Sequence, residues 1–284
     1  MFRIFFYWVF LLSLHGCISE DGLLPYEPLD EDLIIRIQSS YEQMPEGVMT
    51  IDNNNQVIAL YASPTTLYGH GILGDKIEAR QLVVASQGVI HDLVLDDGWV
   101  FEDIRPRLYD VDGDNHPEIV TIRTKVTDGA GIAIYKIYDE GLALYAEVPV
   151  VGRAYRWLNI VTIDDLDNDG TIELLWVQTP HIGGILNAAP IKEGRLTSIS
   201  SLGEYSNHAI GERNLCMSTT VIKNDQTIIY LPNQQGDSIV GLAYKDMTLH
   251  RVESFPHPVD FSIRLNDQIS FTSNKVDQVN CIGG

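Results

Sequence analysis

The sequence predicts an all-β chain built from a repeated unit of four short antiparallel strands. An acidic segment that begins at Asp110 recurs 55 residues later at Asp165. Runs of five to eight apolar and β-branched residues, separated by Gly, Asn, Asp and Pro, dominate the rest of the chain. No segment carries the apolar period of a well-formed helix. With 284 residues, 45% of them hydrophobic, the chain can bury a substantial core in one body.

Residues 1–17 have the composition of an export segment. Arg3 precedes an apolar run, residues 4–14, that is too short for an ordinary membrane-spanning helix. The run ends in Leu14-His15-Gly16-Cys17, which resembles a bacterial lipobox with an atypical His two residues before the Cys. The resemblance implies that Cys17 is lipidated, whereas an ordinary cleaved signal and an uncleaved anchor are the alternatives. All three predict an exported protein, and the lipoprotein reading predicts membrane attachment on a periplasm-facing or outer surface.

The remainder divides into a short tether and one folded domain. Residues 18–32 are acidic and contain proline, which is typical of a tether. Residues 33–284 are expected to form the domain, with Leu33–Ile37 as its first strand. Once Cys17 is set aside, Cys216 and Cys281 remain as an even pair that either forms a disulfide or stays as two buried thiols.

The repeat predicts a β-propeller, because four short antiparallel strands make one blade. Residues 33–284 hold between four and five units of 55 residues, so we expect about five blades, or one more if residues 259–284 complete a blade with the first strand. A ring of seven short blades and an open array are the alternatives. Related units near Asp52 and Thr220 lack the carboxylates and are expected to keep the shape without an ion. The unit after the first acidic segment is expected to contain strands 119–124, 132–138, 142–148 and 156–163, with turns at 128–131 and 139–141.

The two acidic segments have the residue types of calcium loops. Each has carboxylates at positions 1, 3, 5 and 9 of a nine-residue stretch that leads directly into an apolar strand. Ca²⁺ takes six to eight oxygen ligands, and alternate residues of a curled loop can supply them together with the carbonyl of position 7. The competing interpretation is a pair of polar hairpin turns. The predicted ligands are Asp110, Asp112, Asp114, His116 and Glu118 in the first loop, and Asp165, Asp167, Asp169, Thr171 and Glu173 in the second.

These loops resemble the acidic segment of FG-GAP and VCBS repeats, the calcium-binding blades of integrin-α-like propellers. The first loop has Asn115 where that family prefers Gly, and Asn also tolerates a left-handed backbone. The resemblance implies that the calcium ions brace neighbouring strands at the periphery of the propeller.

A second set of residues predicts a ligand pocket. His70, His181 and His208 lie in Gly-rich connections, and equivalent connections of a closed ring emerge on one face. The competing interpretation is that each imidazole hydrogen-bonds to backbone in a turn, and a zinc site is less favoured because no compact ligand spacing is present. The segments around residues 156, 179 and 206 are similar to uncharacterised bacterial VCBS-repeat proteins. The expected pocket residues are His70, Arg156, Trp157, His181, Asn207 and His208, with Arg153, Glu212 and Arg213 nearby.

Charge and the absence of catalytic motifs narrow the function. A formal net charge of −20 argues against a nucleic-acid partner. No nucleophile elbow, phosphate loop or zinc-protease motif is present. We therefore expect a calcium-binding module of the cell envelope that binds a protein or glycan. The alternatives are an envelope or extracellular hydrolase or lyase with the histidines at its channel, and a purely structural envelope component.

Overall fold

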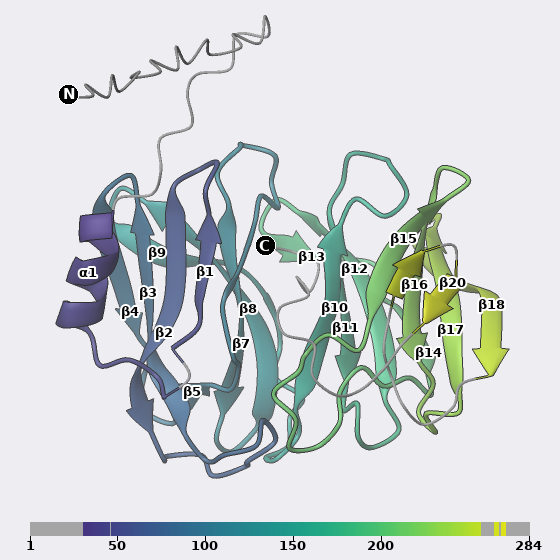
Figure 1. Cartoon of the computed structure of the whole chain (residues 1–284), viewed down its shortest axis with the longest axis horizontal. Helices are drawn as coiled ribbons and strands as arrows, with labels where there is room; N and C mark the ends of the chain where they lie inside the picture. Colours follow the sequence, from purple (N-terminus) through teal and green to yellow (C-terminus); the bar gives the residue numbers. More distant parts are fainter. Residues whose placement is uncertain (1–30, 46, 257–263, 267, 271–284) are drawn as a thin grey trace, which may run out of the picture.

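The computed structural model describes residues 31–45, 47–256, 264–266 and 268–270 (Figure 1). This part of the chain is all-β apart from one helix. It contains no helix with the length and apolarity that a membrane span requires. The predicted export segment, Cys17 and most of the predicted tether lie outside the described residues, as does Cys281.

The first element is a helix, α1 (Glu31–Ser40), where the sequence was expected to form a strand at Leu33–Ile37. That prediction was wrong because the apolar residues follow the helical period. Leu33 and Ile37 are four residues apart and are 3% and 0% exposed, whereas Ile35 between them is 60% exposed. The acidic residues of the first turn, Glu31 and Asp32, favour this helix through its dipole.

The strands form four antiparallel units, numbered here in chain order. One short strand outside these units, β5 (Trp99–Phe101), pairs with β3 (Glu78–Ser86) of unit 1 and with β7 (Glu118–Lys125) of unit 2. It thereby joins the first two units into one nine-stranded sheet. Unit 1 contains β1 (Met49–Asp52), β2 (Val57–Thr65), β3 (Glu78–Ser86) and β4 (Val89–Val94); unit 2 contains β6 (Arg107–Tyr109), β7 (Glu118–Lys125), β8 (Gly129–Tyr138) and β9 (Gly141–Val148). Unit 3 contains β10 (Leu158–Asp164), β11 (Glu173–Gln178), β12 (Ile185–Lys192), β13 (Arg195–Leu196) and β14 (Ser200–Gly203); unit 4 contains β15 (Thr219–Lys223), β16 (Gln226–Pro232), β17 (Ser238–Lys245) and β18 (Thr248–Pro256). A separate hairpin pairs β19 (Arg264–Asn266) with β20 (Gln268–Ser270).

The predicted strands of the repeat are present, but the unit begins one strand earlier than expected. Strands 119–124, 132–138 and 142–148 fall within β7, β8 and β9. The strand predicted at 156–163 corresponds to β10, which pairs with β11 and therefore opens unit 3 instead of closing unit 2. Each acidic loop consequently joins the first and second strands of its own unit.

The carboxylate-poor copies of the repeat are antiparallel units of four strands in which other turns replace the acidic loop. In unit 1 the turn is closed by Asp52, whose Oδ1 accepts a hydrogen bond from the amide of Asn54 at 2.9 Å. In unit 4 only Asn224 and Asp225 separate the strands, with φ angles of 52° and 59°. Two successive left-handed residues make a tight hairpin turn, so unit 4 pairs β15 with β16 through two residues.

Consecutive units pack face to face and share their cores. In β2, Val57, Ala59 and Tyr61 pack with residues of unit 2, whereas Ile58 and Leu60 pack with α1. The alternation of side chains along a strand puts successive residues on opposite faces of the sheet, and here both faces are buried. Units 2 and 3 share a second apolar cluster, and units 3 and 4 share a third.

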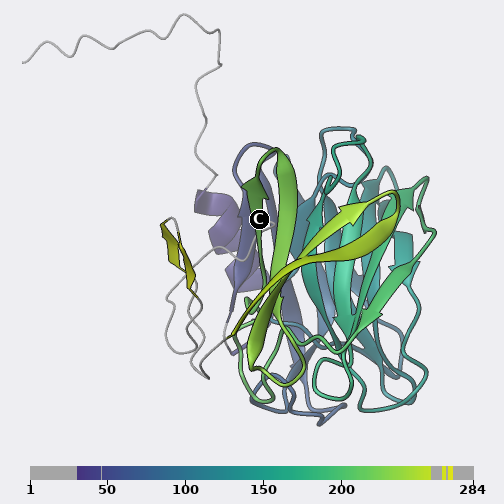
Figure 2. The same cartoon turned by 90° about the vertical axis from the view of Figure 1, so that its right-hand side faces the viewer.

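The units follow one another along the chain from α1 to β18 (Figure 1). In the perpendicular view, units 1 and 4 lie on one side and the middle units on the other, so the units follow an arc (Figure 2). The connection between β2 and β3 contacts the connection between β14 and β15. The amide of Gly211 donates to the carbonyl of Ile72 at 2.9 Å, and Arg213 Nη1 pairs with Asp75 Oδ2 at 2.8 Å.

The helix gives a direct test of this packing. We expect Ile37→Ala to destabilise the protein by about 2–4 kcal/mol, because it removes buried methyl groups and leaves a cavity against unit 1. Ile35→Ala is the matched control and should change the free energy of unfolding by less than about 0.5 kcal/mol. Urea unfolding of both variants checks this, and equal losses would contradict the docking of α1.

Candidate functional site

The two acidic loops are folded alike, position by position. The carboxylate at position 1 accepts backbone amides from positions 5 and 6: Asp110 accepts Asp114 N at 3.2 Å and Asn115 N at 2.9 Å. Asp165 likewise accepts Asp169 N at 3.0 Å and Gly170 N at 2.9 Å. These bonds curl each loop around its first carboxylate.

Positions 4 and 6 adopt the left-handed conformation in both loops. They are Gly113 and Asn115 in the first, with φ of 78° and 66°, and Asn168 and Gly170 in the second, with φ of 59° and 82°. Gly and Asn are the residues that occupy this region at least cost. The order Gly-Asp-Asn in one loop and Asn-Asp-Gly in the other is therefore the same backbone requirement met in two ways.

Position 9 brings a buried carboxylate back under the loop. Glu118 and Glu173 are 1% and 2% exposed, and each accepts the amide of position 2, from Val111 at 2.9 Å and Leu166 at 3.0 Å. Carboxylate oxygens of positions 1, 3 and 9 then lie within 4.8 Å of one another in each loop: Asp110, Asp112 and Glu118 in the first, and Asp165, Asp167 and Glu173 in the second. Both loops therefore have the oxygen donor set that a divalent cation prefers.

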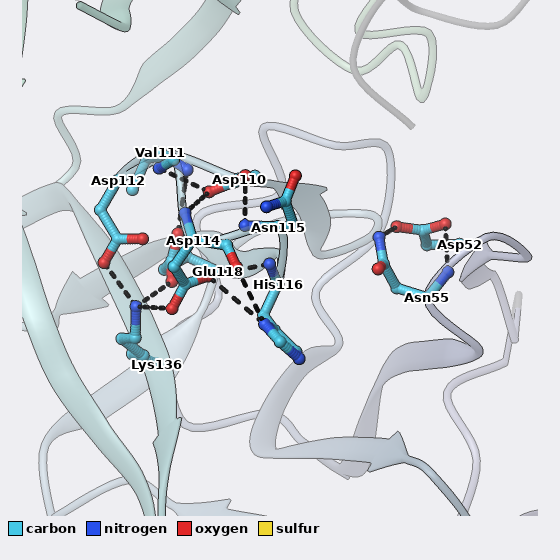
Figure 3. Close-up of polar contacts among 11 residues, drawn as sticks. Asp52, Asn55, Asp110, Val111, Asp112, Asp114, Asn115, His116, Glu118 and Lys136 are labelled. Carbon is cyan, nitrogen blue, oxygen red and sulfur yellow. Dashed lines mark hydrogen bonds and ion pairs between the residues drawn. The ribbon is translucent and has the colours of Figure 1, made fainter.

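A lysine distinguishes the first loop from the second. Lys136 on β8 places its ammonium group against three carboxylates, in contact with Asp112, 2.8 Å from Asp114 Oδ2 and 3.0 Å from Glu118 Oε1 (Figure 3). These contacts outweigh burial and raise the pKa of Lys136. The ammonium group thus supplies the positive charge that a metal ion would otherwise bring.

In the described residues, no lysine comparable to Lys136 contacts the carboxylates of the second loop. Lys192 helps to lower the pKa of Asp169, but no cation contributes to the pKa of Asp167 or Glu173. Pro190 stands opposite Glu173 in the β11–β12 register. Burial and the neighbouring carboxylates raise the pKa of Glu173 to about 7, and the same causes raise the pKa of Asp167. Asp167 Oδ1 is buried without a hydrogen-bond partner in the described part of the chain. The donor set of this loop therefore fits a divalent cation better than that of the first.

The sequence of the first loop did not predict the contact with Lys136, because this residue is on β8, outside the loop. Ile119 and Tyr135 pair across the β7–β8 hairpin. One further step along that register sets Glu118 opposite Lys136. A lysine facing the last carboxylate across the hairpin is the signal that could have separated the two loops.

The predicted pocket histidines belong to a cluster of six side-chain rings, which we call the ring cluster. It lies at connections between strands other than the two acidic loops. In one half, the Trp157 ring centroid is 4.8 Å from that of His208, which is 5.1 Å from that of His181. In the other half, Tyr155 stacks on Tyr68 with centroids 5.2 Å apart. The His70 ring is 5.4 Å from the Tyr155 ring. The ring cluster consists of Tyr68, His70, Tyr155, Trp157, His181 and His208.

Glu102, which the sequence did not single out, links the two halves of the ring cluster. Its carboxylate is fully buried and accepts His70 Nδ1 at 2.6 Å and Thr124 Oγ1 at 2.6 Å. Its backbone carbonyl accepts Trp157 Nε1 at 2.9 Å. Burial raises the pKa of Glu102, and the hydrogen bonds from His70 and Thr124 oppose that change. No sequence motif surrounds Glu102, so only the fold reveals it.

The other predicted pocket residues hold backbone in place. Asn207 is fully buried, and its amide group donates to the carbonyls of Asn159 and Ile160 at 3.4 and 3.3 Å. Arg156 Nη1 donates to the carbonyl of Tyr155 at 2.8 Å. Glu212 contributes its backbone carbonyl, which accepts His208 Nε2 at 2.8 Å.

Glycines permit these connections to approach one another. A Cβ on Gly184, which ends the Gly-rich connection of His181, would lie 1.7 Å from the carbonyl oxygen of Tyr205. A Cβ on Gly129 would lie 2.4 Å from the carbonyl oxygen of Arg153. The Gly-rich composition that the sequence associated with a pocket therefore reflects close backbone contact.

The ring cluster and the second acidic loop lie at opposite ends of one strand. Trp157 directly precedes β10 and Asp165 directly follows it. Seven extended residues span about 20 Å. Changes at one site can therefore be made without touching the other.

The structure decides between the disulfide and the free thiol predicted for Cys216. Cys216 is disulfide-bonded, so the alternative of two free thiols is wrong for this residue. Cys17 and Cys281 both lie outside the described residues.

The histidines predict a pH dependence of stability. Burial lowers the pKa of His181 and of His208 to about 4, and for His181 the neighbouring histidines add to the effect. Because these values lie below the usual 6.5, each of these histidines binds more protons in the unfolded chain. Their contribution to the free energy of unfolding therefore falls as pH decreases from about 6.5 to about 4, whereas Glu78 and Glu173, with pKa raised to about 9 and about 7, contribute in the opposite direction. Urea unfolding across this range should show a smaller decrease for His208→Gln than for the parent protein. His250→Gln, at an exposed position, should leave the decrease unchanged, and an unchanged profile for His208→Gln would contradict the prediction.

Comparisons with known proteins identify structural neighbours only. No family model matches the chain, and no curated protein matches it. A 6-phosphogluconolactonase-like protein from Bacteroides fragilis aligns with a TM-score of 0.39 and 14% identity over 73% of this chain. The chain spans 56% of the length of that structure. An endo-arabinase from Bacteroides thetaiotaomicron aligns with a TM-score of 0.36 and 10% identity over 75% of this chain and 77% of its own.

Proposed function

We propose that this protein is an exported, calcium-stabilised β-propeller that acts as a binding module at the cell envelope. The observation that supports it best is the second acidic loop. Three carboxylates converge there, one oxygen of Asp167 is buried without a partner, and no cation contributes to the pKa of Asp167 or Glu173. Binding a divalent cation would relieve the repulsion among these groups.

The role proposed for the metal is structural. The loop joins β10 to β11 and lies at the end of β10 remote from the ring cluster. An ion that binds the folded loop and not the unfolded chain adds its binding free energy to stability. We also propose that the repeats are of the FG-GAP or VCBS type, that they form about five blades, and that Cys17 carries a lipid anchor. The arc of four packed units supports a propeller.

A second candidate function is an enzyme acting on an envelope or extracellular substrate. The contact that favours it is the one between His70 and the buried carboxylate of Glu102. A carboxylate that orients an imidazole through Nδ1 is the arrangement of many general bases. The same arrangement also serves ligand binding, so we place the binding module first.

Removal of calcium tests the proposal. We expect calcium at about 100 times its dissociation constant to add about 2.7 kcal/mol to the free energy of unfolding, and EGTA to remove this increment. This corresponds to a melting-temperature difference of roughly 5–10 °C for a domain of this size. Asp167→Ala should abolish the difference, whereas Asp225→Ala, in the two-residue turn of unit 4, should retain it. Identical melting temperatures of the parent protein in calcium and in EGTA would refute the metal claim.

Lys136 gives a separate prediction for the first loop. Lys136→Met removes the ammonium group from Asp112, Asp114 and Glu118, so three carboxylates are left without their cation. We expect the variant to be less stable than the parent in EGTA and to bind one additional calcium ion per chain. Isothermal titration calorimetry on the Asp167→Ala background measures this ion alone, and the absence of calcium binding there would contradict the assignment.

A further inference from the structure

The ring cluster contains two imidazole nitrogens whose partners are not supplied by the described protein. They are His181 Nδ1 and His70 Nε2, which come from connections more than one hundred residues apart. The His181 ring stacks on Trp157, and the His70 ring lies between Tyr155 and the buried carboxylate of Glu102. What these nitrogens can bind follows from the hydrogen bonds of the opposite nitrogen in each ring.

A chain of hydrogen bonds fixes the tautomer of His181. His208 Nε2 lies 2.8 Å from the carbonyl of Glu212, which can only accept, so this nitrogen carries the proton. His208 is neutral above about pH 4, so its Nδ1 is an acceptor. His181 Nε2, 2.9 Å from that acceptor, must therefore donate. A neutral His181 is left with its lone pair on Nδ1.

Glu102 orients His70 in the same manner. Its carboxylate accepts both Thr124 Oγ1 and His70 Nδ1, each at 2.6 Å. His70 therefore presents Nε2 to its surroundings. Within the described residues, neither this nitrogen nor His181 Nδ1 has a hydrogen-bond partner, and neither is among the buried atoms that lack one. The His70 side chain is 15% exposed, and His181 is half-buried.

Tyr155 adds an exposed aromatic surface beside His70. The residue is 55% exposed although one face of its ring stacks on Tyr68. Its φ is 56°, a conformation that is costly for a bulky side chain. The Tyr155 amide donates to Tyr68 Oη at 2.6 Å, and this bond holds the strained residue in place.

We infer that the ring cluster binds a neutral saccharide, with Tyr155 against a face of the sugar ring and hydroxyl groups on His70 Nε2 and His181 Nδ1. This inference rests on the binding function proposed above and names its ligand class. A sugar hydroxyl both donates and accepts, so it satisfies a lone pair on either imidazole. The C–H face of a sugar ring suits an exposed aromatic side chain, as in other ligand sites lined by aromatic residues and a few polar groups.

Two other ligand classes fit less well. An anion would find a lone pair and no donor at His181 Nδ1, and the buried carboxylate of Glu102 lies behind His70. A metal ion needs several donor atoms close together, and in the described residues the groups that meet this requirement are the two acidic loops. The imidazoles of the ring cluster are not among them.

The test is calorimetric titration of the intact protein, in calcium, with four neutral oligosaccharides: maltotriose, xylotriose, cellotriose and mannotriose. We expect at least one to bind, and Tyr155→Ala and His181→Ala each to weaken that binding about tenfold or more, the loss expected of a stacking or hydrogen-bonding group at the centre of a site. Tyr138→Ala and His250→Gln are matched controls at exposed positions on β8 and β18. They should bind as the parent protein does.

Nitrogen-15 spectra of the histidine rings supply an independent measurement. The spectra should show His181 protonated at Nε2 and its Nδ1 resonance should move when the saccharide is added. The inference is overturned if none of the four sugars binds at the highest soluble concentration, if Tyr155→Ala binds unchanged, or if sodium phosphate or zinc chloride shifts these resonances and the sugars do not.

Failure of this inference and failure of the metal proposal are distinguishable. The two sites lie at opposite ends of β10. Loss of calcium stabilisation in Asp167→Ala with no sugar binding in any protein refutes the saccharide site alone. If the protein binds sugar and its melting temperature is the same with and without EGTA, the proposed role of the metal is refuted and the saccharide site is not.

Discussion

Every unit of this protein depends on having both faces of its sheet covered. The strands of the second and third positions are apolar on successive residues, as in Val57, Ile58, Ala59 and Leu60 of β2, and all four are 3% exposed or less. A sheet of this kind cannot stop at a face exposed to water, because each buried aliphatic side chain contributes about 1.5–3 kcal/mol only while it is covered. The units therefore stack in series, and α1 covers the face of unit 1 that has no preceding sheet.

The burial of both sheet faces also imposes a free-energy cost on the acidic loops, because a carboxylate of each loop is buried. Glu118 and Glu173 lie at the start of apolar strands and are buried with their units. Carboxylates in such positions need positive charge, since desolvation and mutual repulsion both favour protonation. The first loop obtains that charge from Lys136 on the neighbouring strand. In the second loop Lys192 acts on Asp169, and no described cation acts on Asp167 or Glu173. This difference between nearly identical loops is what favours a metal ion in one of them.

The other end of the units is organised by polar contacts among connections. There the backbone approaches itself closely at Gly129 and Gly184, and buried groups such as Asn207 and Glu102 satisfy the carbonyls and rings that come together. Rigid strands hold these connections, which is how folds commonly present binding groups. The protein thus separates the end that carries acidic loops from the end that carries histidines and aromatic rings.

The sequence by itself determined what depends on neighbours along the chain. Alternation and turn residues predicted β7, β8 and β9 of unit 2, and the nine-residue pattern predicted the positions of two acidic loops, because local backbone geometry sets both. The Gly-rich connections also predicted that His70, His181 and His208 lie at one end of the units, because equivalent connections of a repeat emerge on the same side. The tertiary structure decided the rest. Residues 33–37 are helical because the apolar face of that segment packs on β2, and Lys136 faces Glu118 because the cross-strand register brings them together. Glu102 joins His70 to Trp157 through contacts between residues 32 and 55 positions apart, which leave no local pattern in the sequence.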